Sequence, residues 1–325
     1  MSEKIAIGVI GTGNMGRNHV RVLQSMQQDY EFIGIYDADE RRAATIADVY
    51  DTVAFTQLDA LLERVDAVSI AVPSFLHKEI ALQAAAAGCH VMLEKPIALN
   101  VKDAQAIIQA CQQAGVLLMV GHVERFNPAI MELMKVIENE EIISLDFKRM
   151  SPYDPRIGDA NVVQDLMIHD IDILNAIMGD AALQRLVSQG AKVFSGKLDF
   201  VQAMFTYETG ILASITASRV TESKIRMVEI NAKNAYIFVD FLEKKIEIQR
   251  KTQFSLDIGH DMTYKQENII ERVFVPMSEP LKNEFEHFAH CIHTGEQPRT
   301  NGAMALKALE ICEDISNSAE VGNGQ

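Results

Sequence analysis

The chain has 325 residues, of which 48% are hydrophobic and 23% are charged, so it is long enough for two folded domains of ordinary composition. Acidic residues outnumber basic ones, 45 to 30, and the formal charge of −15 argues against nucleic acid or an anionic membrane as a partner. A small anionic ligand remains open, because a local cluster of arginine and lysine is enough to bind it.

The cysteines and the apolar runs bear on the compartment. None of the four cysteines stands at C-x-x-C spacing, and we expect reduced, mostly buried thiols. The first residues lead directly into an apolar run, which leaves no room for a signal peptide. No apolar run approaches the ~20 residues that a membrane span needs. We therefore expect a cytoplasmic protein.

A glycine-rich turn stands near the start of the chain. An apolar run at 5–10 precedes it, a helical pattern at 14–26 follows it, and the next apolar run ends in an acid, Asp37. This order is typical of the dinucleotide-binding fingerprint. Glycines allow the tight turn, the approach of a pyrophosphate and close packing of the helix, whose free N–H groups attract phosphate. We expect a ligand site here rather than a tight turn alone, formed by Gly11, Thr12, Gly13, Asn14, Met15 and Gly16.

Asp37 is placed to accept hydrogen bonds from the ribose hydroxyls of the adenosine. A carboxylate there repels a 2′-phosphate, so we expect NAD in preference to NADP. Arg41 and Arg42 follow closely, and a guanidinium turned back toward the ribose would tolerate the phosphate.

Residues 1–121 alternate between strand and helix patterns. After the first unit we predict helices at 40–50, 77–87 and 100–114, and strands at 53–56, 66–72, 90–95 and 116–120. Nearly continuous apolar strands alternating with helices indicate a parallel sheet that is covered on both faces. The predicted fold of residues 1–121 is a doubly wound Rossmann domain.

Residues 122–325 have a different pattern. Helices are predicted at 128–138, 164–178, 281–293 and 302–318, and strands at 142–150, 201–207, 211–218, 227–232, 235–240 and 245–249. We expect an α+β domain for substrate binding and oligomerisation, with an open, mostly antiparallel sheet and helices on one face. The sequence leaves open whether the last helices pack on the first domain. The other sheet face is expected to meet another subunit, in a homodimer or homotetramer.

Lys95 lies in the segment Glu94-Lys95-Pro96, at the carboxyl end of a predicted parallel strand. Ligands of doubly wound sheets bind outside these strand ends. The proline keeps Lys95 extended, and a lysine there can exchange a proton with a substrate hydroxyl. The alternative is a strand-end lysine that only reaches for solvent.

Asp165 and His169 are four residues apart in a predicted helix, so they share a face. A histidine oriented by a carboxylate can donate or accept a proton near neutral pH, although a helix-surface histidine is the ordinary alternative. The pair also resembles half of a metal site. Because no second histidine or cysteine stands at ligand spacing, we expect no metal.

Two further segments follow predicted strands. Ala71, Pro73 and His77 are expected at the nicotinamide end of the cleft, with His77 either a contact or simply a residue of the first helical turn. Arg125 connects the two domains. It either holds the geometry near Lys95, binds substrate or pairs with a neighbouring acid.

The glycine turn, the segment Glu94-Lys95-Pro96 and the Asp165-x-x-x-His169 helix together resemble the glucose–fructose oxidoreductase/inositol dehydrogenase (Gfo/Idh/MocA) family. The resemblance covers nearly the whole chain, including the turn at 298–301. It implies an NAD(P)-dependent dehydrogenase acting on CH–OH groups, in which Lys95, Asp165 and His169 act together on the substrate carbinol. It also implies a Rossmann domain followed by an open sheet that forms dimers or tetramers. Glu94 and Lys95 join the expected cofactor site.

A narrower resemblance, carried by residues 120–128, 155–159 and 168–172, is to the UDP-N-acetylglucosamine 3-dehydrogenases of that family. It implies that Arg125, Arg149 and Arg156 supply cations for a diphosphate. The expected substrate site therefore contains Lys95, Arg125, Arg156, Asp165 and His169.

Two alternatives stay open at this point. One keeps the fold and changes the substrate to inositol, a free sugar or a dihydrodiol. The other is a non-enzymatic NAD(H)-binding redox sensor, which would need only the glycine turn and Asp37.

Overall fold

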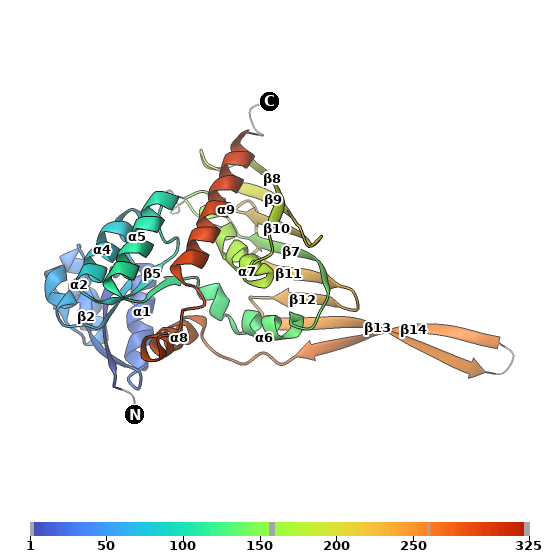
Figure 1. Ribbon diagram of the computed structural model, residues 1–325, viewed down its shortest axis with the longest axis horizontal. Helices are drawn as coiled ribbons and strands as arrows, with labels where there is room; N and C mark the ends of the chain where they lie inside the picture. The colour runs from blue at the N-terminus through green and yellow to red at the C-terminus, as the bar shows by residue number, and fades with distance from the viewer. Residues whose placement is uncertain (1–2, 156–159, 259–260, 322–325) are drawn as a thin grey trace. The chain divides into compact units, whose positions relative to one another are not determined.

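The computed structural model describes residues 3–155, 160–258 and 261–321, and only the backbone of residues 251–267 (Figure 1). The chain divides into two compact units. Unit 1 contains residues 1–126 and 278–310, and unit 2 contains residues 127–277 and 311–325.

Unit 1 is built on a six-stranded parallel sheet with the order β3-β2-β1-β4-β5-β6. The strands are β1 (Ile5–Ile10), β2 (Tyr30–Tyr36), β3 (Ala54–Phe55), β4 (Ala67–Ile70), β5 (His90–Glu94) and β6 (Leu118–Gly121). The order reverses between β1 and β4, which is the switch point where doubly wound sheets bind their ligands. The predicted Rossmann fold is confirmed.

Helices cover both faces of this sheet. They are α1 (Asn14–Ser25), α2 (Glu40–Tyr50), α3 (Leu58–Leu62), α4 (His77–Ala86), α5 (Val101–Ala114) and α8 (Pro280–Thr294). One apolar core lies under α3, α4 and α5, and a second lies under α1, α2 and α8. Local sequence explains the helix ends. Asn100, for example, caps α5 by accepting a hydrogen bond from the Asp103 N–H group.

The end of the chain completes the core of unit 1. The Tyr30 hydroxyl donates a hydrogen bond of 2.6 Å to the Phe285 carbonyl, and Met119 forms an isolated bridge with Asn301. We assigned the whole of 122–325 to the second domain and left the last helices open to packing on the first. The structure counts α8 and the first part of α9 (Gly302–Val321) with unit 1.

Unit 2 contains an eight-stranded sheet with the order β14-β13-β12-β11-β7-β10-β9-β8. Its strands are β7 (Ile142–Met150), β8 (Leu183–Ala191), β9 (Phe200–Tyr207), β10 (Leu212–Ser218), β11 (Ile225–Ala232), β12 (Tyr236–Asp240), β13 (Lys245–Ile258) and β14 (Asp261–Val273). Neighbouring strands are antiparallel except β7 and β10, which run parallel. The expected open, mostly antiparallel sheet is confirmed.

The two faces of this sheet differ in burial. Alternate residues, among them Phe147, Phe205 and Ile215, are buried on the face beside α6 (Pro128–Ile137) and α7 (Ile168–Met178) (Figure 1). Toward β8 the end of α9 contributes, because the Ser188 hydroxyl donates to the Ile315 carbonyl at 2.9 Å.

The opposite face, which we call the open face, carries both apolar and charged side chains. Val187, Met204 and Leu212 are exposed on β8, β9 and β10. Farther along the sheet, Lys148 forms ion pairs with Asp146 and Glu229.

The long ribbon formed by β13 and β14 was not predicted. We predicted a strand at 245–249, but β13 continues to Ile258 and pairs with β14 along its length. Only residues 245–249 of β13 also pair with β12, so the rest is a two-stranded extension of the sheet (Figure 1).

Candidate active site

The glycine turn connects β1 to α1 and has the geometry of a phosphate site. Gly11 has a φ of +86°, and a Cβ there would lie 2.7 Å from the Ala71 carbonyl oxygen. A Cβ on Gly16 would lie 1.8 Å from the Gly11 carbonyl oxygen, so only glycine fits. A Cβ on Gly13 would meet nothing within 4 Å, which leaves room for a ligand.

The N-terminus of α1 is the second part of this site. Gly13 is its N-cap residue, no described side chain caps the helix, and its first turn contains no acid. The first N–H groups of the helix and the positive end of its dipole can therefore bind an anion. Asn14 and Met15 are exposed at this end, whereas Gly16 is buried. These residues fit a dinucleotide pyrophosphate.

Asp37 lies beside the turn, at the end of β2. Its carboxylate accepts hydrogen bonds from the N–H and hydroxyl groups of Thr12, both at 2.7 Å, and from the Asp39 N–H group at 2.9 Å. Arg42 donates two further hydrogen bonds, of 2.8 and 3.0 Å. Burial raises the pKa of Asp37, but the hydrogen bonds from Arg42, Asp39 and Thr12 outweigh it and bring the pKa to about 2. The carboxylate is therefore ionised, and Arg42 offsets its charge.

His77 connects two loops of the site. Its Nδ1 atom lies 2.8 Å from the Pro96 carbonyl oxygen and its Nε2 atom 3.0 Å from that of Val72. Burial lowers the pKa of His77, although both carbonyls favour the charged ring. A neutral ring can donate to only one of them. His77 is the first residue of α4, and it holds together the loops that follow β4, with Ala71 and Pro73, and β5.

Lys95 follows β5 directly and is half-buried, and its peptide bond to Pro96 is cis. Its N–H group donates to the Glu94 carboxylate at 3.2 Å. Glu94 itself is buried and contacts His19, with 3.0 Å between Oε1 and Nε2. Burial raises the pKa of Glu94, but the hydrogen bond to His19 and the charge of Lys95 lower it more. A buried carboxylate therefore stands directly before the candidate base.

Asp165 and His169 belong to unit 2, and the local structure differs from the prediction. We predicted one α-helix over 164–178, but residues 163–167 form a π-helical turn, η3 (Val163–Met167), and α7 begins at Ile168. The π turn holds Asp165, and His169 is the second residue of α7. The two residues therefore stand on either side of a change from π to α geometry, a change that the prediction did not include.

Arg219 fixes the position of Asp165, and sequence reasoning missed it. Its Nη2 atom donates to Asp165 Oδ2 at 3.0 Å, and the guanidinium also donates to the carbonyls of Ala160 and Asn161. The residue is only 2% exposed. The available signal was a charged residue directly after the apolar strand β10, at the edge where the parallel neighbour β7 also ends.

The three arginines expected to bind a diphosphate differ in burial and in the elements that hold them. Arg149 is 1% exposed and forms hydrogen bonds of 2.7 and 3.0 Å with Asp170, so its expected role is wrong. Its position on β7 alternates toward the buried face, where a cation needs a carboxylate partner. Arg125 is half-buried in a short 3-10 helix, η2 (Val123–Phe126), after β6. Arg156 lies outside the described residues.

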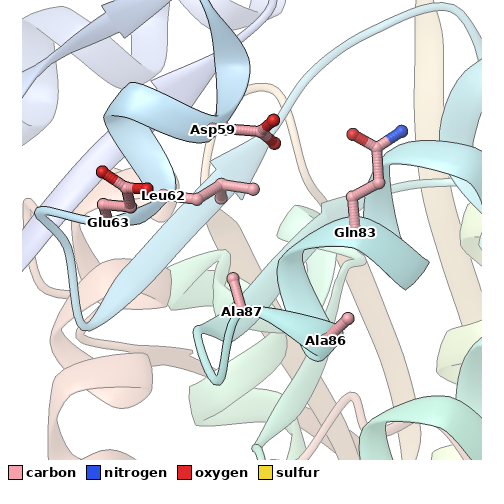
Figure 2. Close-up of a pocket in the computed structure, with 6 residues that line it drawn as sticks. All are labelled: Asp59, Leu62, Glu63, Gln83, Ala86 and Ala87. Carbon is pink, nitrogen blue, oxygen red and sulfur yellow. The ribbon is translucent and has the colours of Figure 1, made fainter.

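A hollow of about 350 Å³ lies elsewhere on unit 1. Figure 2 shows the six side chains that line it, from the region of α3 and the end of α4: Asp59, Leu62, Glu63, Gln83, Ala86 and Ala87. These segments lead into the amino ends of β4 and β5, whereas the glycine turn and Lys95 lie at carboxyl ends. The hollow is therefore separate from the candidate site.

The residues that the structure describes contain no group of three or more histidine, cysteine or acidic side chains arranged to hold a metal ion. In the same residues, no helix combines the length and apolarity needed to cross a membrane.

Comparison with known proteins places this architecture. Residues 5–122 match the model of an oxidoreductase family with an NAD-binding Rossmann fold. The chain is 34% identical over 244 residues to UDP-N-acetylglucosamine 3-dehydrogenase of Acidithiobacillus ferrooxidans, covering 75% of this chain and 76% of that protein. The solved structure of a UDP-N-acetylglucosamine 3-dehydrogenase from the same organism has a TM-score of 0.88, with 29% identity over 98% of this chain and 99% of that one.

An inositol 2-dehydrogenase of Arthrobacter sp. is 29% identical over 227 residues, covering 66% of this chain and 67% of that protein. The match at 34% identity covers most of both chains, and unit 1 has the Rossmann fold that the family model names. The chain therefore belongs to the Gfo/Idh/MocA oxidoreductase family and is an NAD-binding dehydrogenase that acts on CH–OH groups of sugars or polyols.

Proposed function

We propose that this enzyme oxidises a secondary alcohol of a nucleotide sugar, the C3 hydroxyl of a UDP-N-acetylhexosamine, with NAD as the hydride acceptor. The observation that carries the proposal is the open N-terminus of α1 at the carboxyl edge of a sheet on which Lys95 also stands. Similarity to the A. ferrooxidans 3-dehydrogenase supports the choice of substrate.

In this proposal the glycine turn of residues 11–16 binds the pyrophosphate, and Asp37 binds the adenosine ribose hydroxyls. The nicotinamide end is lined by Ala71, Pro73 and the loop after β5. Bound NAD supplies the hydride acceptor, and the chain moves the proton. Lys95 takes it from the substrate hydroxyl, directly or through His169, and Asp165 orients that histidine.

Arg125 and Arg156 are the proposed cations for the substrate diphosphate, because guanidinium groups bind phosphate oxygens in pairs. The −15 charge of the chain makes such local cations necessary for an anionic substrate.

Incubation of the purified enzyme with NAD or NADP and a panel of UDP-N-acetylhexosamines, myo-inositol and free sugars tests the proposal. Reduced nicotinamide, followed by its absorbance, should form with a UDP-sugar and NAD. The variant Lys95→Met should lose turnover while calorimetry still shows NADH binding. Near-normal turnover of Lys95→Met would overturn the proposed role of this lysine.

A second candidate substrate is inositol, because an inositol 2-dehydrogenase is also similar over two thirds of the chain. Reduction of NAD with myo-inositol but with no UDP-sugar would keep the proton chemistry and replace the substrate.

We further propose that the open face of the unit 2 sheet joins copies of the chain into a homodimer or homotetramer. Its exposed apolar side chains support this assembly, because a broad apolar sheet face is rarely left in water.

A further inference from the structure

Three buried polar side chains of unit 1 form a chain of hydrogen bonds that the proton chemistry above does not use. His19 Nδ1 lies 2.6 Å from Ser69 Oγ, and His19 Nε2 lies 3.0 Å from Glu94 Oε1. Ser69 and His19 are 0% exposed and Glu94 is 8% exposed. Buried polar groups of this kind are costly unless each has a partner, so their arrangement needs an explanation.

The direction of the hydrogen bonds follows from the groups involved. The Glu94 carboxylate can only accept, so the proton of a neutral His19 ring is on Nε2 and points to Glu94. The Ser69 hydroxyl then donates to Nδ1. With a neutral ring, this arrangement gives each ring nitrogen a partner.

Each of these three hydrogen-bonded residues comes from a different element of the dinucleotide fold. His19 is on α1, the helix that begins at the glycine turn, Ser69 is on β4, and Glu94 ends β5. The ring of His19 also packs edge-on against Phe285, with 5.4 Å between ring centroids. On the neighbouring strand β6, a Cβ on Gly121 would lie 3.1 Å from Glu94 Oε1, so glycine leaves the space that this carboxylate occupies.

Glu94 connects Ser69 and His19 to the candidate base, Lys95. Its second oxygen, Oε2, accepts the backbone N–H group of Lys95 at 3.2 Å. One carboxylate therefore contacts His19 with one oxygen and the backbone of Lys95 with the other.

We propose that Ser69, His19 and Glu94 are positioning residues that couple the phosphate-binding helix α1 to Lys95. When a dinucleotide occupies the N-terminus of α1, these three hydrogen-bonded residues hold the backbone of Lys95 in the position that catalysis needs. This inference rests on the proposed role of Lys95, and it assigns no contact with the substrate to the three residues themselves.

Four variants test the proposal. Ser69→Ala removes the far end, His19→Leu removes the ring donor, His19→Gln restores an N–H donor, and Glu94→Gln leaves only one accepting oxygen. His90→Gln is the matched control, since His90 is on the same strand as Glu94 at its other end and accepts a hydrogen bond from the Leu117 N–H group.

Steady-state kinetics should show a split between kcat and KM. We expect kcat to fall roughly tenfold or more in His19→Leu and Glu94→Gln, with KM for NAD within about threefold of the wild type, because the loss affects the position of Lys95 rather than binding. His19→Gln should recover most of kcat, and His90→Gln should keep the wild-type value.

Hydrogen exchange supplies a readout that does not depend on turnover. In the wild type, NADH should slow exchange in the peptide that contains the Lys95 amide. In Ser69→Ala and Glu94→Gln this protection should be reduced at least about threefold. The Lys95 amide loses a hydrogen-bond partner in Glu94→Gln, and His19, which links it to α1, loses one in Ser69→Ala. Circular dichroism identifies any variant that fails to fold.

Lys95→Met, measured in parallel, separates the two proposals. If Lys95→Met is inactive while Glu94→Gln and Ser69→Ala keep wild-type kcat and NADH-dependent protection, the coupling is overturned and the proposed function stands. If Lys95→Met stays active, the proposed role of Lys95 fails. The exchange experiment then still decides whether α1 and residue 95 are coupled.

Discussion

At the scale of single residues, an arginine–aspartate pair holds a candidate site residue in each unit. Arg42 binds Asp37 beside the glycine turn, and Arg219 binds Asp165 in the π turn. The pairs differ in exposure, because the Arg42 side chain is 48% exposed and that of Arg219 is 2% exposed. The first arginine is accessible to a ligand, whereas the second is buried.

The Asp37–Arg42 pair leads to a prediction about the cofactor. Asp37→Ser removes the charge that repels a 2′-phosphate and leaves Arg42 to bind it, so kcat/KM with NADP should rise about tenfold relative to NAD. Arg42→Ala is the control. It leaves Asp37 uncompensated and should lower the use of NADP further. Unchanged ratios in both variants would exclude this pair as the source of the preference.

The Arg219–Asp165 pair leads to a prediction about turnover. Arg219→Leu should lower kcat at least about tenfold, since Asp165 loses the cation that holds it, and Arg219→Lys should lose less because it keeps the charge. Kinetics on folded protein, checked by circular dichroism, give the measurement. Arg185→Leu, an exposed site on β8, should behave like the wild type. Equal losses at residues 185 and 219 would contradict a specific role.

At the scale of elements, α8 contains a histidine whose titration affects stability. Burial, together with the charges of Arg299 and His290, lowers the pKa of His287 from 6.5 to about 4. Its Nε2 atom accepts the Arg299 N–H group at 3.0 Å, which a neutral ring allows.

The folded protein therefore binds fewer protons at His287 than the unfolded chain does as the pH falls from 6.5 toward 4. The contribution to the free energy of unfolding is complete above the unfolded pKa and decreases as the pH falls below it, by on the order of 1 kcal/mol with solvent screening. Urea unfolding at several pH values should show a smaller decrease in His287→Gln. The control His293→Gln, exposed on the same helix, should follow the wild type.

Sequence pattern predicted most of the elements that bury a face, but it missed α3, whose three leucines are buried. Helix α2 and strand β7 have the predicted bounds, and α5 begins within one residue of its predicted start. The outer part of β13 and all of β14 were missed, although Phe254, Leu256 and Ile258 alternate with polar residues in the sequence.

The candidate site was predictable where its chemistry is local in sequence. The glycine turn and Asp37 lie within one βαβ unit, and the Thr12 N–H group of the turn donates to Asp37. Arg219 is 54 residues from Asp165, and Glu94 is 75 residues from His19, so no spacing rule connects these partners. Arg149 was assigned wrongly because a single sequence does not tell whether a strand arginine faces solvent or a buried aspartate.

At the scale of the whole molecule, the open face of the unit 2 sheet predicts self-association. Met204 is 62% exposed there, near Leu212 and Val187. Met204→Arg should shift the protein toward the monomer in sedimentation velocity, because the charge would be buried in the proposed interface. Val49→Arg makes a similar change at an exposed site on α2 and should leave the assembly unchanged. A wild-type monomer at all accessible concentrations would contradict the proposed interface.

The π turn at 163–167 has a consequence for insertions and deletions in this helix. A π turn takes one more residue than an α turn, so removing Gln164 would let the hydrogen bonds close as in a regular α-helix. Each α-helical residue advances by about 100°, so residues before the deletion would be rotated by roughly that angle relative to His169. The extra residue of the π turn thus sets the angle between the residues before it and His169, without changing any of these side chains.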